Sequence, residues 1–287
     1  MNLMTTATFP GGRAVSRLGF GGAAIGLTNY LGRYDAAGER AASVAVVRQA
    51  VAGGVTYFDT APGYGAGLSE TIFGEALEGV EGITLATKVK ADPAVDVRAS
   101  LEASLGRLRR GRVDLLQIHG TSIDAETCRA ILAPGGMLAQ MVRLREEGLV
   151  GAVGFTSEDN NPAVYELIGS GSFDTMQIAY NLLLQHPYEP TRPFGSLVAA
   201  KAAGMFTVAM RASTSGIFQR WVRMVNPADD FDYTPALIQF ALSNRLLDVA
   251  LVGMRTPSDV ASCLDIWRDV GGRIDVDALW ERYVPPG

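Results

Sequence analysis

Four ionisable residues share a position at, or a few residues beyond, the end of a short apolar run: Asp59, Tyr64, Lys88 and His119. The runs cover residues 55–58, 83–87 and 113–118 and are typical of buried β-strands. In a parallel barrel, the carboxyl ends of the strands meet at one face, and the catalytic groups gather there. The sequence therefore predicts a site in which a carboxylate, a phenol, an ammonium and an imidazole handle protons together.

Tyr64 is the residue in this group that is best suited to act as a general acid. A free phenol has a pKa near ~10 and is a poor acid at neutral pH, but a nearby ammonium favours the phenolate. Lys88 would lower the pKa of Tyr64 in this way, and Asp59 would pair with Lys88. His119 could donate a hydrogen bond to a carbonyl oxygen or share the proton. Taken singly, Tyr64 could be an ordinary loop residue, Asp59 and Lys88 a structural ion pair, and His119 a polar residue with its hydrogen bonds made. Together at consecutive strand ends, they favour a carbonyl that accepts a hydride while its oxygen is protonated, or the reverse oxidation.

The elements that must position these residues alternate between strands and helices. Predicted strands cover residues 17–20, 55–58, 83–87, 113–118, 150–155, 175–180, 206–210 and 249–252. Predicted helices cover residues 39–52, 69–77, 96–108, 137–147, 163–168, 195–203, 235–243 and 257–270. Eight strands, each followed by a helix, predict an α/β fold of the (β/α)8 TIM-barrel type as a single domain over residues 1–287.

Three further segments complete the predicted architecture. An N-terminal β-hairpin is expected from residues 6–9 and 13–15, which flank a Pro-Gly-Gly turn. Residues 121–136 and 213–234 read as long loops on the catalytic side of the barrel, where pocket walls usually lie.

A second constellation follows the eighth predicted strand. Thr256 reads as a helix N-cap, Pro257 as the first helical residue and Asp259 as the partner in a capping box. The free amides of that helix end, with Arg255 beside them, predict an anion site in the usual phosphate region of a barrel. By contrast, the glycines at 19–22 only loosely match a dinucleotide fingerprint, because no acidic residue ends a following strand at the required spacing.

Composition narrows the class of protein. Hydrophobic residues make up 48% of the 287, the net charge is −5 and no basic cluster occurs, so nucleic acid and anionic membranes are not expected partners. The two cysteines, Cys128 and Cys263, read as buried thiols, and two histidines are too few for a metal site of several His or Cys ligands. We therefore expect no metal site. No signal peptide or membrane-spanning run is apparent, so we expect a cytoplasmic protein.

The chain resembles the aldo-keto reductase superfamily over nearly its whole length. The matching stretches are 18–22 (LGFGG), 59–65 (DTAPGYG), 69–70 (SE), 87–89 (TKV), 114–119 (DLLQIH), 154 (G), 177–181 (QIAYN) and 253–255 (GMR). The resemblance implies a barrel that binds a nicotinamide cofactor, usually NADP(H), without a Rossmann domain. It implies Tyr64 as general acid, helped by Lys88, Asp59 and His119. The segment around Asp59 looks most like bacterial branches that include sugar 1-dehydrogenases and pyridoxal dehydrogenases.

The resemblance also implies a set of cofactor-binding residues. Gln177 would bind the carboxamide of the nicotinamide, and Asp59 is also an expected cofactor contact. The other expected contacts to the ring, the pyrophosphate and the adenosine end are Gly22, Thr156, Arg211, Ser213, Gly216, Gly253, Arg255 and Asp259.

This sequence departs from the family pattern at three places in that set. Thr156–Ser157 replaces a common Ser-Asn pair, which changes one amide contact to the carboxamide. Arg211 or Met210 would cover the ring where an aromatic residue is usual. Asp259 stands near the adenine end, where it can either cap its helix, which we favour, or face the ribose and disfavour a 2′-phosphate.

The predicted function is therefore the NADP(H)-dependent interconversion of an aldehyde or ketone and its alcohol, with a small carbonyl compound or sugar as the substrate. Two alternatives stay open at this point. One is an NAD(H)-dependent sugar (lactol) dehydrogenase. The other is a cofactor-sensing regulatory subunit on the same barrel, against which the complete set of four catalytic residues argues.

Overall fold

Eight parallel strands form a closed barrel in a computed structural model that describes residues 5–30, 32–189 and 194–280. The strand order is β10-β3-β4-β5-β6-β7-β8-β9. The strands are β3 (Leu18–Gly21), β4 (Tyr57–Asp59), β5 (Thr84–Lys90), β6 (Val113–His119), β7 (Val150–Ser157), β8 (Thr175–Ala179), β9 (Phe206–Met210) and β10 (Val249–Val252). The predicted (β/α)8 barrel is confirmed.

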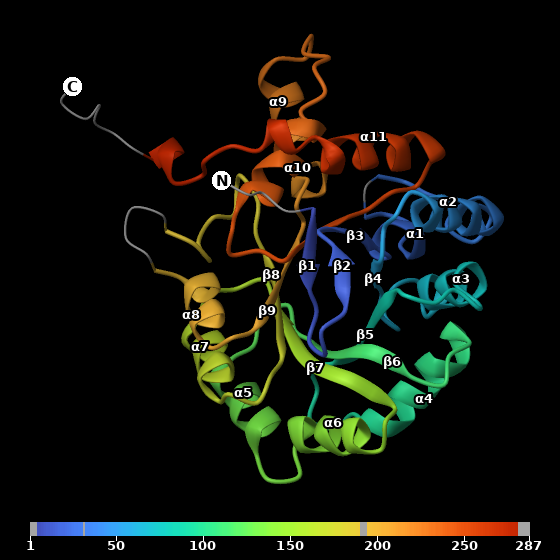
Figure 1. The fold of residues 1–287 in the computed structure, drawn as a ribbon, viewed down its shortest axis with the longest axis vertical. Helices are drawn as coiled ribbons and strands as arrows, with labels where there is room; N and C mark the ends of the chain where they lie inside the picture. The colour runs from blue at the N-terminus through green and yellow to red at the C-terminus, as the bar shows by residue number, and fades with distance from the viewer. Residues whose placement is uncertain (1–4, 31, 190–193, 281–287) are drawn as a thin grey trace.

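Helices surround the strands on the outside of the barrel (Figure 1). They are α1 (Ala23–Gly26), α2 (Arg40–Ala52), α3 (Leu68–Ala76), α4 (Val97–Leu108), α5 (Ala125–Leu132), α6 (Met137–Glu146), α7 (Pro162–Gly169), α8 (Ser196–Ala202), α9 (Ile217–Val225), α10 (Thr234–Ser243) and α11 (Pro257–Arg268). Short 3-10 turns cover Thr214–Gly216, Val270–Gly272 and Ala278–Trp280. In the part of the chain that is described, no helix has the length and apolar character needed to cross a bilayer.

The predicted hairpin is confirmed as β1 (Thr6–Thr8) and β2 (Ala14–Ser16), which pair antiparallel. It covers the amino end of the barrel, in front of the strands in Figure 1. Phe9 of its turn packs edge-on against the rings of Tyr57 and Phe206, which point into the barrel. Because this end is filled by apolar side chains, the polar residues of the interior lie toward the opposite, carboxyl end.

The side chains of β6 point alternately toward the surrounding helices and into the barrel. Leu116 and Ile118 pack outward against the helices, whereas Leu115 belongs to the cluster inside the barrel. Since side chains alternate along a strand, Gln117 and His119 point inward on the same face as Leu115. Polar residues at the carboxyl end of a strand are thereby brought into the mouth of the barrel.

Two segments that read as loops contain helices, so those predictions are wrong. Residues 121–136 include α5, whose N-cap Asp124 accepts a hydrogen bond from the Thr127 amide and whose Cys128 and Ile131 are buried. Residues 213–234 include α9, none of whose residues is buried. Both helices are short, eight and nine residues, but their apolar residues recur at helical spacing, so this periodicity could have revealed them.

Cys128 and Cys263 are both free and buried, as expected for thiols of the core.

Candidate active site

A cavity of about 260 Å³ opens at the carboxyl ends of the barrel strands. Asp59, Tyr64 and His119 line it, and Lys88 lies directly behind them with 1% of its surface exposed. Asp59 and His119 are the last residues of β4 and β6, and Lys88 lies inside β5, which runs two residues beyond it. The four predicted catalytic residues therefore meet in one place.

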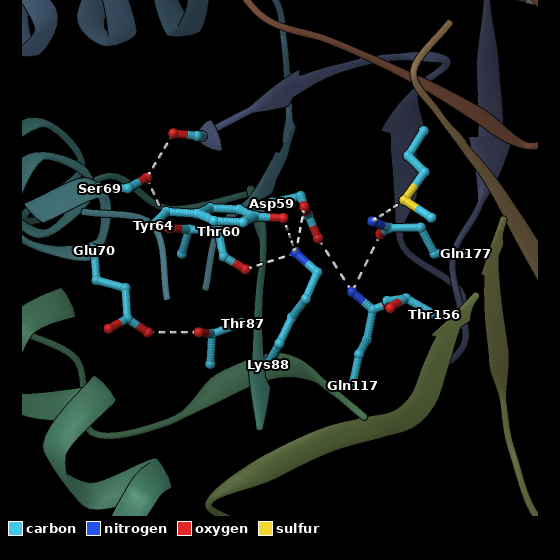
Figure 2. Close-up of polar contacts among 12 residues, drawn as sticks. Asp59, Thr60, Tyr64, Ser69, Glu70, Thr87, Lys88, Gln117, Thr156 and Gln177 are labelled. Atoms are coloured by element: carbon cyan, nitrogen blue, oxygen red, sulfur yellow. Dashed lines mark hydrogen bonds and ion pairs between the residues drawn. The ribbon is translucent and has the colours of Figure 1, made fainter. Parts of the chain in front are cut away.

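Lys88 is the centre of the hydrogen-bond network, as Figure 2 shows. Its Nζ donates to Asp59 Oδ1 at 2.6 Å and to the Thr60 carbonyl oxygen at 2.7 Å. The same Nζ lies 3.4 Å from the Tyr64 hydroxyl oxygen and 5.0 Å from the centre of its ring. Two strong acceptors thus hold the ammonium in place beside the phenol.

The acidity of Tyr64 is set by opposing effects. Burial raises the pKa of Tyr64, the Lys88 charge lowers it, and Asp59 raises it again, with a net shift above the ordinary value. The predicted direction of the Lys88 effect is confirmed, but the expectation of a net lowered pKa is wrong. A phenol in a low-dielectric pocket loses more from desolvation of its anion than one paired ammonium restores.

The Asp59–Lys88 pair stays charged in this setting. Burial on its own would lower the pKa of Lys88, but the charges of Asp59 and Tyr64 outweigh it and raise that pKa. Burial raises the pKa of Asp59, which hydrogen bonds from Lys88 and Gln117 hold down in turn. The side chain of Lys88 is 0% exposed and that of Asp59 is 3% exposed. Water therefore cannot solvate either charge if its partner is removed.

His119 is a neutral imidazole at physiological pH. Burial, and next the charge of Lys88, lower the pKa of His119 to about 3. Its ring packs edge-to-face against Tyr64, with the ring centres 5.5 Å apart. His119 is therefore suited to donate a neutral hydrogen bond to an oxygen in the cavity and not to supply a proton.

Gln117 connects the catalytic pair to Gln177, and it is not among the functional residues predicted from the sequence. Its Nε2 donates to Asp59 Oδ2 at 3.1 Å and to Gln177 Oε1 at 3.3 Å (Figure 2). The Gln177 Nε2 lies 3.8 Å from a weak sulfur acceptor, Met210 Sδ, and the Gln177 side chain also helps to lower the pKa of Asp59 by hydrogen bonding. The alternation of Leu115, Gln117 and His119 along β6 is the signal that could have revealed it.

Gly154 leaves room for that connection across β7. Gly154 pairs with Gln117 on one side and with Thr175 on the other. A Cβ at this position would lie 2.0 Å from Thr175 Oγ1, so any larger residue would displace the side chains inside the barrel.

Ser69 connects the glycine loop after β3 to the lysine site. Its hydroxyl donates to the Gly22 carbonyl at 2.9 Å and accepts from Thr60 Oγ1 at 2.8 Å (Figure 2). Thr60 is the residue whose carbonyl binds Lys88. A Cβ on Gly22 would lie 2.4 Å from Ser69 Oγ, so a glycine is needed here for close approach.

The predicted cofactor-binding residues lie on two neighbouring cavities. Those on the catalytic cavity are Asp59, Thr156, Gln177, Arg211, Ser213 and Gly253. Gly22 adjoins this cavity through its neighbours Gly21 and Ala23. Gly216 lines a second, more open cavity of about 960 Å³, which also carries Arg220 and Arg223. The two cavities share Leu27, Tyr30, Arg211 and Ser215.

Arg255 and Asp259 lie at the start of α11. Asp259 Oδ2 accepts from the Arg255 and Thr256 amides, both at 2.9 Å, and the capping box is complete, which confirms the favoured capping role. The Arg255 guanidinium donates to the Ala24 carbonyl at 2.7 Å and lies over the ring of Tyr34. In this state it is directed toward α1 and the loop that follows.

Two cross-loop contacts at the edge of the catalytic cavity were not apparent from the sequence. The hydroxyls of Tyr30 and Ser215 are hydrogen-bonded at 2.9 Å, and Arg211 Nη2 donates to Glu158 Oε1. Residues 30, 158 and 215 belong to no motif, so only the folded loops bring them together. Together with Leu27, these side chains narrow the entrance to Tyr64.

A buried lysine–carboxylate pair beside a phenol and a neutral imidazole, at the carboxyl end of a barrel, defines an oxidoreductase that handles carbonyl groups. The model of the aldo/keto reductase family matches residues 17–263, and the chain belongs to that family. This membership confirms the predicted family and the predicted enzyme class.

Curated relatives and solved structures agree with this placement. The chain is 26% identical to D-threo-aldose 1-dehydrogenase of a Pseudomonas species, over 91% of this chain and 92% of the relative. It is 27% identical to an aldo-keto reductase of Bacillus subtilis, over 89% and 86%. A Klebsiella pneumoniae aldo-keto reductase in complex with NADPH shares the fold, with a TM-score of 0.71, 20% identity and coverage of 96% and 93%.

Proposed function

We propose that this protein interconverts an aldehyde or ketone and the corresponding alcohol with NADP(H), and that Tyr64 is the general acid and base. One observation carries the proposal: the Lys88 ammonium is fixed by Asp59 and the Thr60 carbonyl at 3.4 Å from the Tyr64 hydroxyl. A nearby cation makes a buried phenol a better acid than burial alone would allow, and two acceptors hold that cation beside Tyr64.

The residues on the cavity fit a nicotinamide ring. Gln177 Nε2 is a buried donor at the wall of the cavity, beside the weak acceptor Met210 Sδ at 3.8 Å, and could donate to a carboxamide oxygen there. Thr156 and Gly253 line the same cavity, and Met210 rather than Arg211 is placed to cover the ring, because Arg211 is paired with Glu158. The bound cofactor supplies or accepts a hydride at this position.

The adjoining cavity fits the phosphate groups of a dinucleotide. Ser215 and Gly216 lie at the start of α9, and Arg220 and Arg223 add two positive charges to its wall. Arg255 would supply a third contact if its guanidinium turned from Ala24 toward a 2′-phosphate. Because Asp259 is engaged as a cap, it is not directed at a ribose, which favours NADP(H) over NAD(H).

Each residue of the site has its own role in the proton transfer. His119 donates a neutral hydrogen bond to the substrate oxygen, and Tyr64 gives its proton to that oxygen in reduction or removes it in oxidation. Lys88 stabilises the phenolate that is left, and Asp59 keeps Lys88 protonated and in place. Gln117 orients Gln177 through the same carboxylate.

A sugar dehydrogenase is the second candidate. It is supported by the similarity to D-threo-aldose 1-dehydrogenase, and the same four residues would run the oxidation of a sugar. The intact network around Lys88 favours either enzyme over a cofactor-sensing subunit.

The test is Tyr64→Phe, assayed with NADPH and a panel of simple aldehydes and ketones. Loss of the phenolic proton should reduce turnover by roughly 10²–10⁴-fold, while the Kd for NADPH changes little. Tyr165→Phe is a matched control, because Tyr165 lies on α7 and its hydroxyl has no hydrogen-bond partner among the described residues. Near-native reduction by Tyr64→Phe would remove Tyr64 from the mechanism.

A further inference from the structure

An ion pair stands on the wall of the catalytic cavity, where a substrate would lie. Glu158 and Arg211 line the same cavity as Tyr64 and His119. The Arg211 Nη2 donates to Glu158 Oε1, and the two side chains are 31% and 30% exposed. Both charged groups are therefore open to a ligand, unlike the fully buried Asp59–Lys88 pair.

The position of Arg211 is imposed by the backbone. Arg211 has a φ of +61°, in the left-handed region that residues with a side chain seldom adopt unless other contacts hold them there. The Asn181 side-chain amide and the Thr214 amide both donate to the Arg211 carbonyl, at 3.0 and 2.7 Å. These bonds direct the guanidinium from the end of β9 to Glu158 at the end of β7, on the far side of β8.

The charge on the substrate side of the cavity is balanced. Among the described residues that line it, the ionised ones are Asp59, Glu158 and Arg211, and Asp59 is already paired with Lys88. An acidic substrate would have to displace Glu158 from Arg211 and remain beside its carboxylate. A neutral polyol can instead accept a hydrogen bond from the guanidinium and donate one to the carboxylate while the pair stays intact.

We propose that the Glu158–Arg211 pair selects neutral, polyhydroxylated carbonyl compounds such as sugars and rejects acidic ones, with Glu158 as the specificity-determining residue. Arg211 supplies the donor to one hydroxyl and Glu158 accepts from its neighbour. This inference rests on the proposed carbonyl reduction at Tyr64 and names the class of substrate for that same cavity.

The experiment compares neutral and acidic sugars in Glu158→Gln. Glucose and glucuronate, and glyceraldehyde and glyceraldehyde 3-phosphate, are assayed as matched pairs at saturating NADPH, together with simple aldehydes. In the wild type, kcat/KM should favour the neutral member of each pair by at least about tenfold. In Glu158→Gln the ratio of acidic to neutral kcat/KM should rise by about 10- to 100-fold, because Arg211 loses its partner and becomes available to an anion.

Two further variants separate selection from a structural role. Arg211→Gln should lower kcat/KM for the neutral sugars without any gain for the acidic ones. Glu166→Gln, on the exposed side of α7, should leave both ratios as in the wild type. Thermal unfolding and NADPH binding of each variant show whether it is folded.

The outcomes distinguish this proposal from the one it rests on. A ratio that moves less than about twofold in Glu158→Gln, a wild type that prefers the acidic members, or reduction of simple aldehydes but of no sugar would overturn the selectivity and leave the carbonyl reductase in place. Failure to oxidise NADPH with any carbonyl compound would contradict the proposed function itself.

Discussion

The four residues at the floor of the site lie on barrel strands and are almost fully buried: Asp59, Lys88, Gln117 and Gln177. The residues at its rim lie on loops and are only partly buried: Tyr30, Glu158, Arg211 and Ser215. The floor is held by the register of β4, β5, β6 and β8, whereas the rim depends on contacts between loops and on a strained backbone. Rigid strands thus fix the proton chemistry, and the loops determine which ligand reaches it.

The largest effect should come from breaking the floor at Lys88. Lys88→Met leaves Asp59 buried without its partner, which should destabilise the protein by about 3–5 kcal/mol. It also removes the cation beside Tyr64, and we expect turnover to fall by at least about 100-fold. Thermal unfolding and single-turnover rates measure the two effects separately.

Lys90→Met is the matched control, because Lys90 lies two residues further along β5 with its side chain 77% exposed. The double variant Lys88→Met/Asp59→Asn should regain stability but no activity, since the unpaired charge is gone while Tyr64 still lacks its cation. Turnover restored in this double variant would show that Lys88 matters only for folding.

Arg255→Ala tests the region next to the rim. A charge-assisted hydrogen bond contributes about 1.5–3 kcal/mol, so losing one should weaken NADPH binding by about 10- to 100-fold. NADH lacks the 2′-phosphate, and its Kd should hardly change. Equal losses for the two cofactors would mean that Arg255 supports α1 through the Ala24 carbonyl and does not read the phosphate.

A smaller effect is expected where Gln117 acts through Gln177. Gln117→Leu and Gln177→Leu should each raise the Kd for NADPH by about tenfold, the value of one lost hydrogen bond. If Gln117 works by orienting Gln177, the double variant should be no worse than Gln177→Leu alone.

Binding of 2′-phospho-ADP-ribose, which lacks the nicotinamide, should be unchanged in both variants. Thr84→Val controls for the loss of a polar group inside the barrel, because no residue in the described part of the chain hydrogen-bonds to Thr84 Oγ1. Additive effects of the two glutamine variants would show that Gln117 does not act through Gln177.

The floor could be predicted from the sequence to a greater extent than the rim. Asp59, Lys88 and His119 follow or end apolar runs, and the barrel topology brings such positions together whatever the loops do. Gln117 is also placed by its barrel strand, and it could have been found from the alternation of inward-pointing residues along β6. The net acidity of Tyr64 could not, because burial has the larger effect on it and burial is a property of the folded pocket.

The rim depends on contacts between segments far apart in the chain. Glu158 and Arg211 are 53 residues apart in the sequence, and nothing in the sequence around either residue indicates that they form an ion pair. The helix α9 could have been predicted, because Ile217, Trp221 and Met224 recur at helical spacing, but the exposure of these residues in the fold could not. Only the folded loops show which side chains face the substrate.

The pH dependence of hydride transfer in the two directions tests the central claim most directly. Reduction requires the protonated phenol, and the pKa of Tyr64 lies above its ordinary value, so the rate of reduction should be constant between about pH 5 and 8. Oxidation requires the phenolate, whose fraction rises about tenfold per pH unit below that pKa, so the rate of oxidation should rise accordingly. His119, with its pKa lowered to about 3, should add no inflection in this range. A single ionisation between about pH 6 and 7 that governs both directions would assign the proton to His119 and contradict the account.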